Sequence, residues 1–319
     1  MGGILSTVRN YSAATAQGWP PKPRFSTEQI PDLTGRVVIV TGGNTGIGKE
    51  TIKALLQHNA KVYLAARSKE KAEAAIADLK DTTGKEAIWL ELDLANLASV
   101  RRAAEEFLSK EHELHILFNN AGIMFCPVEL LTADGYDMQF GTNVLGHFFF
   151  TELLMPALEE AAKSSPDGHA RIVTTSSSGA YLDTLHWDTF RDNLAARKKL
   201  GTQNLYFQSK FGNVVVAREI ARRYADKGIL SFSCNPGNLK TDLQRYVKGI
   251  QNKLIDMILY PASYGALTQL WAGTMPDVVD HNGDFLIPWA RFGRCREEAY
   301  DPQVGERLWN WLQEQVKDH

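Results

Sequence analysis

The sequence predicts a single α/β domain built on a doubly wound parallel sheet, with helices on both faces. Three observations lead to this expectation. Short apolar runs rich in β-branched residues, of which residues 36–41 are the first, alternate with helical stretches along the chain. The first run leads directly into a glycine-rich turn and a helix. Polar residues follow several later runs, at the strand ends where such sheets bind their ligands.

Composition narrows the class of protein. With 319 residues, of which 44% are hydrophobic, the chain can bury a large core. A formal charge of -2 gives no indication of a nucleic-acid partner. The cysteines Cys126, Cys234 and Cys295 are odd in number and include no CxxC pair, which favours a reducing, cytoplasmic location without a disulfide framework. No apolar run approaches the length of about 18 residues expected of a membrane span.

Residues 1–35 are predicted to form an N-terminal arm without a core of its own. Met1 to Ser6 match the pattern for N-myristoylation of Gly2, which would give weak, reversible binding to a membrane surface. The alternative is a disordered start followed by an extended segment, which the proline-rich residues 19–23 support.

The glycine-rich turn joins the strand at 36–41 to a helix expected from Lys49 to about His58. Its glycines, spaced GxxxGxG, would let the backbone approach a dinucleotide pyrophosphate, and the helix N-terminus would favour the negative charge. The expected contacts are Gly42, Asn44, Thr45, Gly46, Ile47 and Gly48.

The end of the second strand, residues 61–66, predicts the type of cofactor. A carboxylate there would bind the ribose hydroxyls of NAD, whereas this chain has Arg67 and Lys69. Two cations suit the 2'-phosphate of NADP(H), so we expect that cofactor. The alternative is that Arg67 only begins the next helix.

The remaining elements continue the alternation. Helices are expected at 69–80, 99–110, 134–162, from Tyr206 to about 227, at 262–273 and at 302–316. Strands are expected at 87–92, 114–118, 170–175, 229–234 and 284–287, the last closing the sheet. Residues at strand ends that are expected to reach the cofactor are Asp93, Leu94, Asn120, Ala121 and Gly122. The strand at 229–234 leads into Pro236 and Gly237, with Thr241 just beyond. The domain would span 36–319, with substrate lids at about 179–202 and 243–260.

Tyr206 and Lys210 lie four residues apart, so on a helix they share a face. The ammonium could then stabilise the ionised phenol, which would make it an acid or base nearer neutral pH. As an isolated pair they would more often be a surface tyrosine and a solvated lysine. The glycine turn, Asn143 on the preceding helix and the serine cluster 176–178 favour a catalytic role.

Together these motifs resemble the short-chain dehydrogenase/reductase family, in particular its retinol dehydrogenase-like branch. The resemblance spans roughly residues 33–290 and rests on the glycine turn, residues 119–122, Asn143, the serine cluster and the Tyr206–Lys210 pair. Residues 124–127 and 132–140 point to the branch. It implies a Rossmann-type fold.

The resemblance also implies residue roles. Tyr206 would be the general acid or base, and Lys210 would lower its pKa and bind the nicotinamide ribose. Ser177 would bind the substrate carbonyl, with Ser176 and Ser178 as alternatives. Asn143 would hold a water that relays protons to Lys210. In addition, Thr241 would meet the nicotinamide carboxamide, whereas Asn235 replaces a histidine common in the branch and receives no role.

The expected function is an NADP(H)-dependent oxidoreductase that interconverts a lipophilic aldehyde or ketone and its alcohol, as a carbonyl reductase. The lipophilic substrate is inferred from Phe125, Trp187, Phe190, Tyr246 and Leu254. Alternatives are a cofactor-bound scaffold or binding protein with little turnover, and an epimerase using the same site. A homodimer through the Tyr206 helix is left open. No metal is expected, because the histidines lack ligand spacing.

Overall fold

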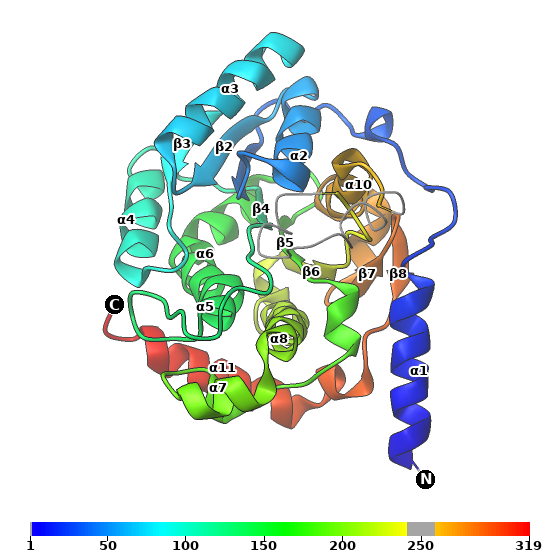
Figure 1. Ribbon diagram of the computed structural model, residues 1–319. Helices are drawn as coiled ribbons and strands as arrows, with labels where there is room; N and C mark the ends of the chain where they lie inside the picture. Colours follow the sequence, from blue (N-terminus) through cyan, green and yellow to red (C-terminus); the bar gives the residue numbers. More distant parts are fainter. Residues whose placement is uncertain (1, 241–258) are drawn as a thin grey trace.

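The chain folds around one mainly parallel sheet. The structure is a computed structural model that describes residues 2–240 and 259–319, with side chains from residue 6 onward. In these residues, the strands follow the order β3-β2-β1-β4-β5-β6-β7-β8, with helices on both faces (Figure 1). They are β1 (Val37–Thr41), β2 (Lys61–Ala66), β3 (Ile88–Glu91), β4 (Ile116–Asn119), β5 (Ala170–Thr175), β6 (Ile229–Cys234), β7 (Phe285–Ile287) and β8 (Arg291–Gly293). The predicted doubly wound α/β fold is confirmed.

The helices form a layer on each side of the sheet. They are α1 (Gly2–Ala16), α2 (Gly46–Gln57), α3 (Lys69–Thr83), α4 (Leu97–Leu108), α5 (Met138–Phe140), α6 (Gly146–Ser164), α7 (Leu194–Leu200), α8 (Thr202–Arg223), α10 (Ala262–Thr274) and α11 (Pro302–Val316). Helices α2, α3 and α10 pack on one face, while α4, α6 and α8 pack on the other, with α11 outside α8. No described helix is long and apolar enough to cross a bilayer.

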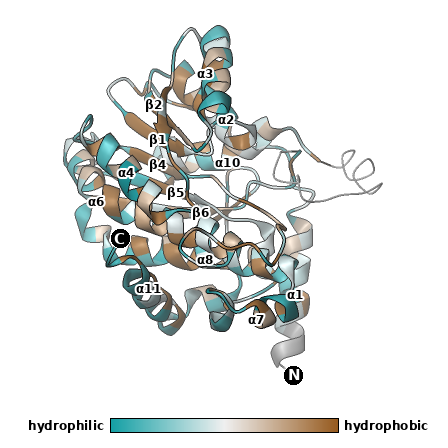
Figure 2. Cartoon of the chain, turned by 60° about the vertical axis from the view of Figure 1, so that its left-hand side comes forward, coloured by the Kyte–Doolittle hydropathy of each residue, from teal (hydrophilic) through white to brown (hydrophobic). Residues whose placement is uncertain are grey.

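Successive side chains of a strand point to opposite faces of the sheet, and this divides the apolar core between the two helix layers. In β1, Val37 and Ile39 belong to the apolar cluster under α4, α6 and α8, whereas Val38 and Val40 belong to the cluster under α2 and α10. Figure 2 shows the apolar residues concentrated on the strands, with polar residues on the outer sides of the helices. The continuous apolar runs of the sequence are therefore strands buried on both faces.

The edge of the sheet and the N-terminal arm differ from expectation. The strand predicted at 284–287 does not close the sheet, because β8 pairs with β7 antiparallel and forms the edge. Only three residues make up β8, which is too short for a sequence pattern to reveal. The N-terminal arm, expected to be disordered or extended, begins with the helix α1.

The helix predicted over 134–162 starts later than expected and is interrupted once. Asp137 accepts hydrogen bonds from the N–H groups of Gln139 and Phe140, so helical structure begins only at Met138. A π-helical turn, η2 (Gly141–Leu145), then separates α5 from α6. The wider turn places Asn143 toward the neighbouring loop, as π turns at functional sites commonly do.

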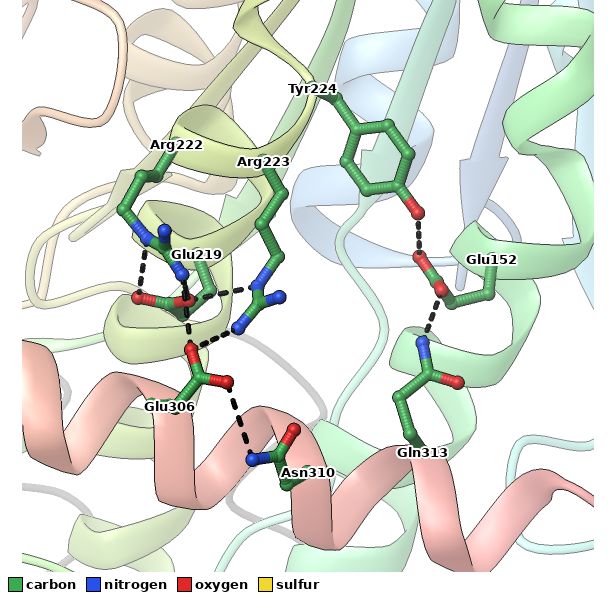
Figure 3. A network of polar contacts seen from close by, with 8 residues as sticks. All are labelled: Glu152, Glu219, Arg222, Arg223, Tyr224, Glu306, Asn310 and Gln313. Atoms are coloured by element: carbon green, nitrogen blue, oxygen red, sulfur yellow. Dashed lines mark hydrogen bonds and ion pairs between the residues drawn. The ribbon is translucent and has the colours of Figure 1, made fainter.

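Helix α11 covers part of the outer side of α8 through a network of charged and amide groups (Figure 3). Glu219 binds Arg222 and Arg223 on α8, and both arginines reach Glu306 on α11. This side of α8 is therefore occupied by the chain itself, and a homodimer through α8 would need another part of its surface.

Candidate active site

A cavity of about 710 Å³ opens at the carboxyl ends of the parallel strands. Its walls come from the turn after β1 and from the segments after β2, β3, β4, β5 and β6, together with α8. The predicted site residues that line it are Gly42, Asn44, Thr45, Gly46, Ile47, Gly48, Arg67, Asp93, Leu94, Asn120, Ala121, Gly122, Ser177, Tyr206, Lys210, Pro236 and Gly237. Folding thus brings together nearly all the residues predicted to form the site.

The glycine turn forms a close-fitting backbone cradle on one wall. Gly42 and Gly46 have φ angles of +67° and +53°, which favour glycine. A Cβ on Gly48 would lie 2.4 Å from the carbonyl oxygen of Gly42, so no side chain fits there. Because α2 starts at Gly46, its oriented N–H groups face the same cradle. This arrangement fits a dinucleotide pyrophosphate.

The positively charged residues that follow β2 differ from the prediction at one position. Arg67 lines the cavity, but Lys69 does not. The Lys69 ammonium lies 5.7 Å from the ring centre of Trp89 and 3.8 Å from Glu73. Lys71, two residues further along α3, lines the cavity instead. The helix begins at Lys69, and its rotation of about 100° per residue turns these two lysines apart.

Tyr206 and Lys210 are both buried on α8 at the inner wall. The Lys210 ammonium lies 5.7 Å from the Tyr206 ring centre and donates to the carbonyl oxygen of Thr175 at 3.0 Å. Burial lowers the pKa of Lys210 to about 8 and raises the pKa of Tyr206 to about 12. Desolvation of the phenol is the largest cause of the rise, and the lowering of the Tyr206 pKa by Lys210 stays a prediction.

The three serines after β5 have different surroundings. Ser176 is buried at the cavity wall, and its hydroxyl donates to the main-chain carbonyl of Lys210 at 2.7 Å. Ser177 accepts from the N–H of Gly179 at 3.0 Å, and its hydrogen bond with the Tyr206 phenol partly offsets the rise in that pKa. Ser178 begins the short helix η3 (Ser178–Tyr181). The geometry therefore brings Ser177 to the phenol.

Asn143 lies behind the cavity wall rather than on it. Its Oδ1 accepts from the N–H of Ile123 at 2.9 Å, and its Nδ2 donates to the Ile123 carbonyl and the Ser209 hydroxyl, each at 3.0 Å. The side chain thus fastens the loop after β4 to α8, one residue before Lys210. This contact accounts for an asparagine in a helix, where its intrinsic propensity is poor.

His147 supports the same region, although the sequence suggested no role for it beyond an unsupported metal ligand. Its Nδ1 lies 3.0 Å from the main-chain carbonyl of Asn143, so this nitrogen carries the proton and donates. Its Nε2 lies 2.9 Å from the Thr41 hydroxyl at the end of β1. Burial lowers the pKa of His147 to about 4, which keeps the ring neutral. Only the folded contacts reveal this link between β1 and the π turn.

The other end of the cavity is apolar. Phe125, held at a φ of +53°, places its ring 5.3 Å from that of Tyr206. The further apolar residues lining the cavity are Ile123, Met124, Leu130, Met138, Leu182, Phe207, Leu239 and Leu259.

The remaining aromatic residues of the substrate prediction do not form this wall. Phe190 instead stacks on Phe140 at 3.8 Å, and Trp187 packs against Phe190, so neither lines the cavity. Thr241, Tyr246, Leu254 and most of the lid predicted at 243–260 lie outside the described residues.

The fold and cavity define a Rossmann-type α/β protein with a tyrosine–lysine pair beside a nucleotide cradle. The short chain dehydrogenase family matches residues 36–189. A short-chain dehydrogenase/reductase of Armillaria gallica is 60% identical over 310 residues, covering 97% of this chain and 99% of that protein. Mouse retinol dehydrogenase 11 is 37% identical over 285 residues, covering 87% and 85%. The chain belongs to the short-chain dehydrogenase/reductase family and has a retinol dehydrogenase-like relative.

A solved structure agrees with this fold. The Pseudomonas aeruginosa RhlG complex with NADP superposes with a TM-score of 0.63 at 24% identity. The match covers 81% of this chain and 95% of that one. At this level of identity the likeness concerns the arrangement of helices and strands, which it supports over most of both chains.

Proposed function

We propose that this oxidoreductase is an NADP(H)-dependent carbonyl reductase that interconverts a lipophilic aldehyde or ketone and its alcohol. One observation carries the proposal: Tyr206, Lys210 and Ser177 meet at the wall of a cavity whose other walls are a glycine cradle and an apolar surface. A proton donor, a cation and a hydroxyl at one point are what the reduction of a carbonyl requires from a protein.

The cofactor proposal rests on the cradle and on Arg67. The turn from Gly42 to Gly48 would hold the pyrophosphate, while Arg67 and Lys71 would bind the 2'-phosphate that distinguishes NADP(H). Asp93 and the Asn120–Gly122 segment would border the nucleoside. RhlG, which shares the fold, is in complex with NADP. When bound, the cofactor supplies the hydride, and the chain supplies binding and orientation.

The state of Tyr206 supports the reducing direction. A phenol whose pKa is raised to about 12 keeps its proton at neutral pH and can donate it to a carbonyl oxygen. Ser177 would donate a hydrogen bond to the same oxygen. Lys210 would bring positive charge to the phenolate left behind, and Asn143 would hold the loop after β4 in place.

The apolar end of the cavity supports a neutral, lipophilic substrate. Among the described residues near Phe125, the lining consists of aliphatic, aromatic and thioether side chains. Such a surface binds by excluding water from apolar groups and offers no partner for a charged one.

We also propose a cytoplasmic location with peripheral membrane contact through Gly2. The acylation pattern at the N-terminus supports it, as do the exposed side chains of Val8, Tyr11 and Trp19 on the same arm.

Oxidation of NADPH by a panel of aldehydes and ketones tests the proposed activity. We expect turnover that rises with the apolar surface of the carbonyl compound and is faster with NADPH than with NADH. Tight binding of NADPH without oxidation by any compound would support a binding protein instead.

A further inference from the structure

We propose that Gln17 is a positioning residue that joins the two loops flanking the candidate active site. This inference concerns the same cavity and therefore rests on the proposed function for its catalytic consequence. Gln17 follows the last residue of α1, in the arm that the sequence analysis treated as independent of the domain. Figure 1 shows α1 along the side of the molecule where β7 and β8 lie.

The side chain of Gln17 is buried, with 7% of its surface exposed. Its Oε1 accepts a hydrogen bond from Nδ2 of Asn235 at 2.7 Å. Its Nε2 donates to the hydroxyl of Tyr181 at 2.9 Å. Both partners are themselves buried, at 2% and 4% exposure, so these contacts are shielded from competing water.

The two partners belong to loops on different sides of the cavity. Tyr181 ends η3, the short helix that starts directly after Ser177. Asn235 follows β6, and its Oδ1 accepts from the N–H of Gly237 at 3.0 Å. Because Gly237 lines the cavity, one amide of the arm connects the serine loop with the loop that would border the nicotinamide.

The directions of the hydrogen bonds fix the orientation of the Gln17 amide. The Tyr181 hydroxyl donates its proton to the carbonyl of Arg294 at 2.8 Å, so it can only accept from Gln17. Oδ1 of Asn235 is engaged by Gly237, so its amino group faces Gln17 and needs an acceptor. A glutamine in one orientation satisfies both requirements, and an apolar side chain of the same length satisfies neither.

The neighbouring residue shows that the arm fits closely against the same loop. A Cβ placed on Gly18 would lie 3.0 Å from Nδ2 of Asn238. Pro236, Gly237 and Asn238 all line the cavity. The contact therefore reaches the cavity wall itself, and loss of the Gln17 amide should loosen that wall more than it loosens α1.

The test compares Gln17→Met with Arg9→Gln. Both residues attach the same segment, but Arg9 does so through an exposed ion pair with Glu297, away from the cavity. Hydrogen–deuterium exchange of the cofactor-free protein is measured at residues 178–182 and 235–238. Titration with NADPH and steady-state kinetics are measured in parallel.

For Gln17→Met we expect faster exchange at both segments and weaker NADPH binding. The KM for NADPH should rise about tenfold, with kcat changed by less than about threefold, as expected for the loss of buried amide hydrogen bonds. Arg9→Gln should leave the exchange of both segments and the KM as in the original protein. Tyr181→Phe removes the bonds of its hydroxyl to Gln17 and to the Arg294 carbonyl but keeps the Asn235 contact, so of the two segments only 178–182 should exchange faster.

The inference is overturned if Gln17→Met speeds exchange only within α1 and leaves the KM unchanged. If Gln17→Met does not fold, Tyr181→Phe decides alone: unchanged exchange at 178–182 contradicts the proposal. A protein that oxidises no NADPH, yet shows the predicted exchange, contradicts the proposed function and leaves the connecting role of Gln17 intact.

Discussion

Helix α8 carries two polar clusters, one half-exposed and one buried, that differ in how their charges are balanced. Near its C-terminal end, Glu219 lies 2.8 Å from Arg222 and 3.0 Å from Arg223, and Glu306 of α11 completes the set (Figure 3). Near its N-terminal end, Lys210 donates to a main-chain carbonyl, and within the described part of the chain no carboxylate pairs with it.

The difference separates a structural cluster from the one that we propose is catalytic. The pKa of Arg222 is raised by its hydrogen bond and charge interaction with Glu219, so folding favours the charged form. The pKa of Lys210 is lowered to about 8 by burial, so folding opposes its charge. A protein keeps an uncompensated buried cation at some cost in stability, and sites that bind or react are where such groups concentrate.

The largest effect is expected from removing the phenol. Tyr206→Phe should lower kcat about 10³-fold, the usual contribution of a general acid, while NADPH binding and the melting temperature stay close to the original values. Steady-state kinetics, cofactor titration and thermal unfolding measure the three quantities.

Tyr224→Phe provides the matched control at the residue that follows the last turn of α8. The Tyr224 hydroxyl donates to Glu152 at 3.1 Å, and Glu152 also binds Gln313 of α11 (Figure 3). This variant should lose stability and keep its kcat. If instead Tyr224→Phe abolished turnover and Tyr206→Phe did not, the two clusters would have been assigned the wrong way round.

A second test concerns Arg67, another cation of the cavity. Arg67 has no ion pair within residues 2–240 and 259–319, which leaves its guanidinium available for a phosphate. Arg67→Asp should lower the ratio of kcat/KM for NADPH to that for NADH about 100-fold, through loss of charged hydrogen bonds. Lys69→Gln is the control, because Lys69 points to Trp89 and Glu73. An unchanged ratio in Arg67→Asp would mean that another group binds the 2'-phosphate.

The smallest effect on turnover is expected in the cluster around Glu219. Substitutions there should lower stability instead. Glu219→Gln removes the charge that neutralises Arg222 and Arg223, and because solvent screens these partly exposed pairs the free energy of unfolding should fall by about 1 kcal/mol while kcat stays the same. Urea unfolding and kinetics measure both. Gly305→Ala should also destabilise the protein, because a Cβ there would lie 2.3 Å from Oε1 of Glu219. A loss of turnover in either variant without a loss of stability would break the comparison.

Local patterns in the sequence predicted much of the fold and of the candidate site. The i, i+4 spacing placed Tyr206 and Lys210 on one helix face, and the glycine turn predicted the cradle between β1 and α2. Strand ends that meet at one edge of a parallel sheet brought Arg67 and Asp93 to the same cavity. Each of these inferences needs only a few neighbouring residues and the rule that parallel strands share a direction.

What could not be predicted depends on contacts between distant segments. Gln17 and Asn235 are 218 positions apart, and no pattern around either one indicates the other. The π turn at Asn143 forms because of its bonds to Ile123 and Ser209, which helix propensity does not contain. The rise in the Tyr206 pKa could not be predicted from spacing either, because it comes from desolvation of the phenol in the folded chain.

The most direct test of the contrast on α8 is the stability of Lys210→Met without cofactor, measured by urea unfolding from pH 7 to pH 10. The pKa of Lys210 is about 8 in the folded protein, below its ordinary value of 10.5. Below pH 8 Lys210 keeps its proton in both the folded and the unfolded protein, so the full cost of burying its charge is present. Between these values the folded state releases its proton first, so the original protein gains stability as pH rises.

Lys210→Met removes that cost, and the Thr175 carbonyl keeps the amide of Asn213 as a donor at 3.1 Å. The account therefore predicts a variant that is inactive yet more stable at pH 7 by about 1–3 kcal/mol, with the difference shrinking toward pH 10. A variant that is less stable at pH 7, by an amount that does not change with pH, would contradict it.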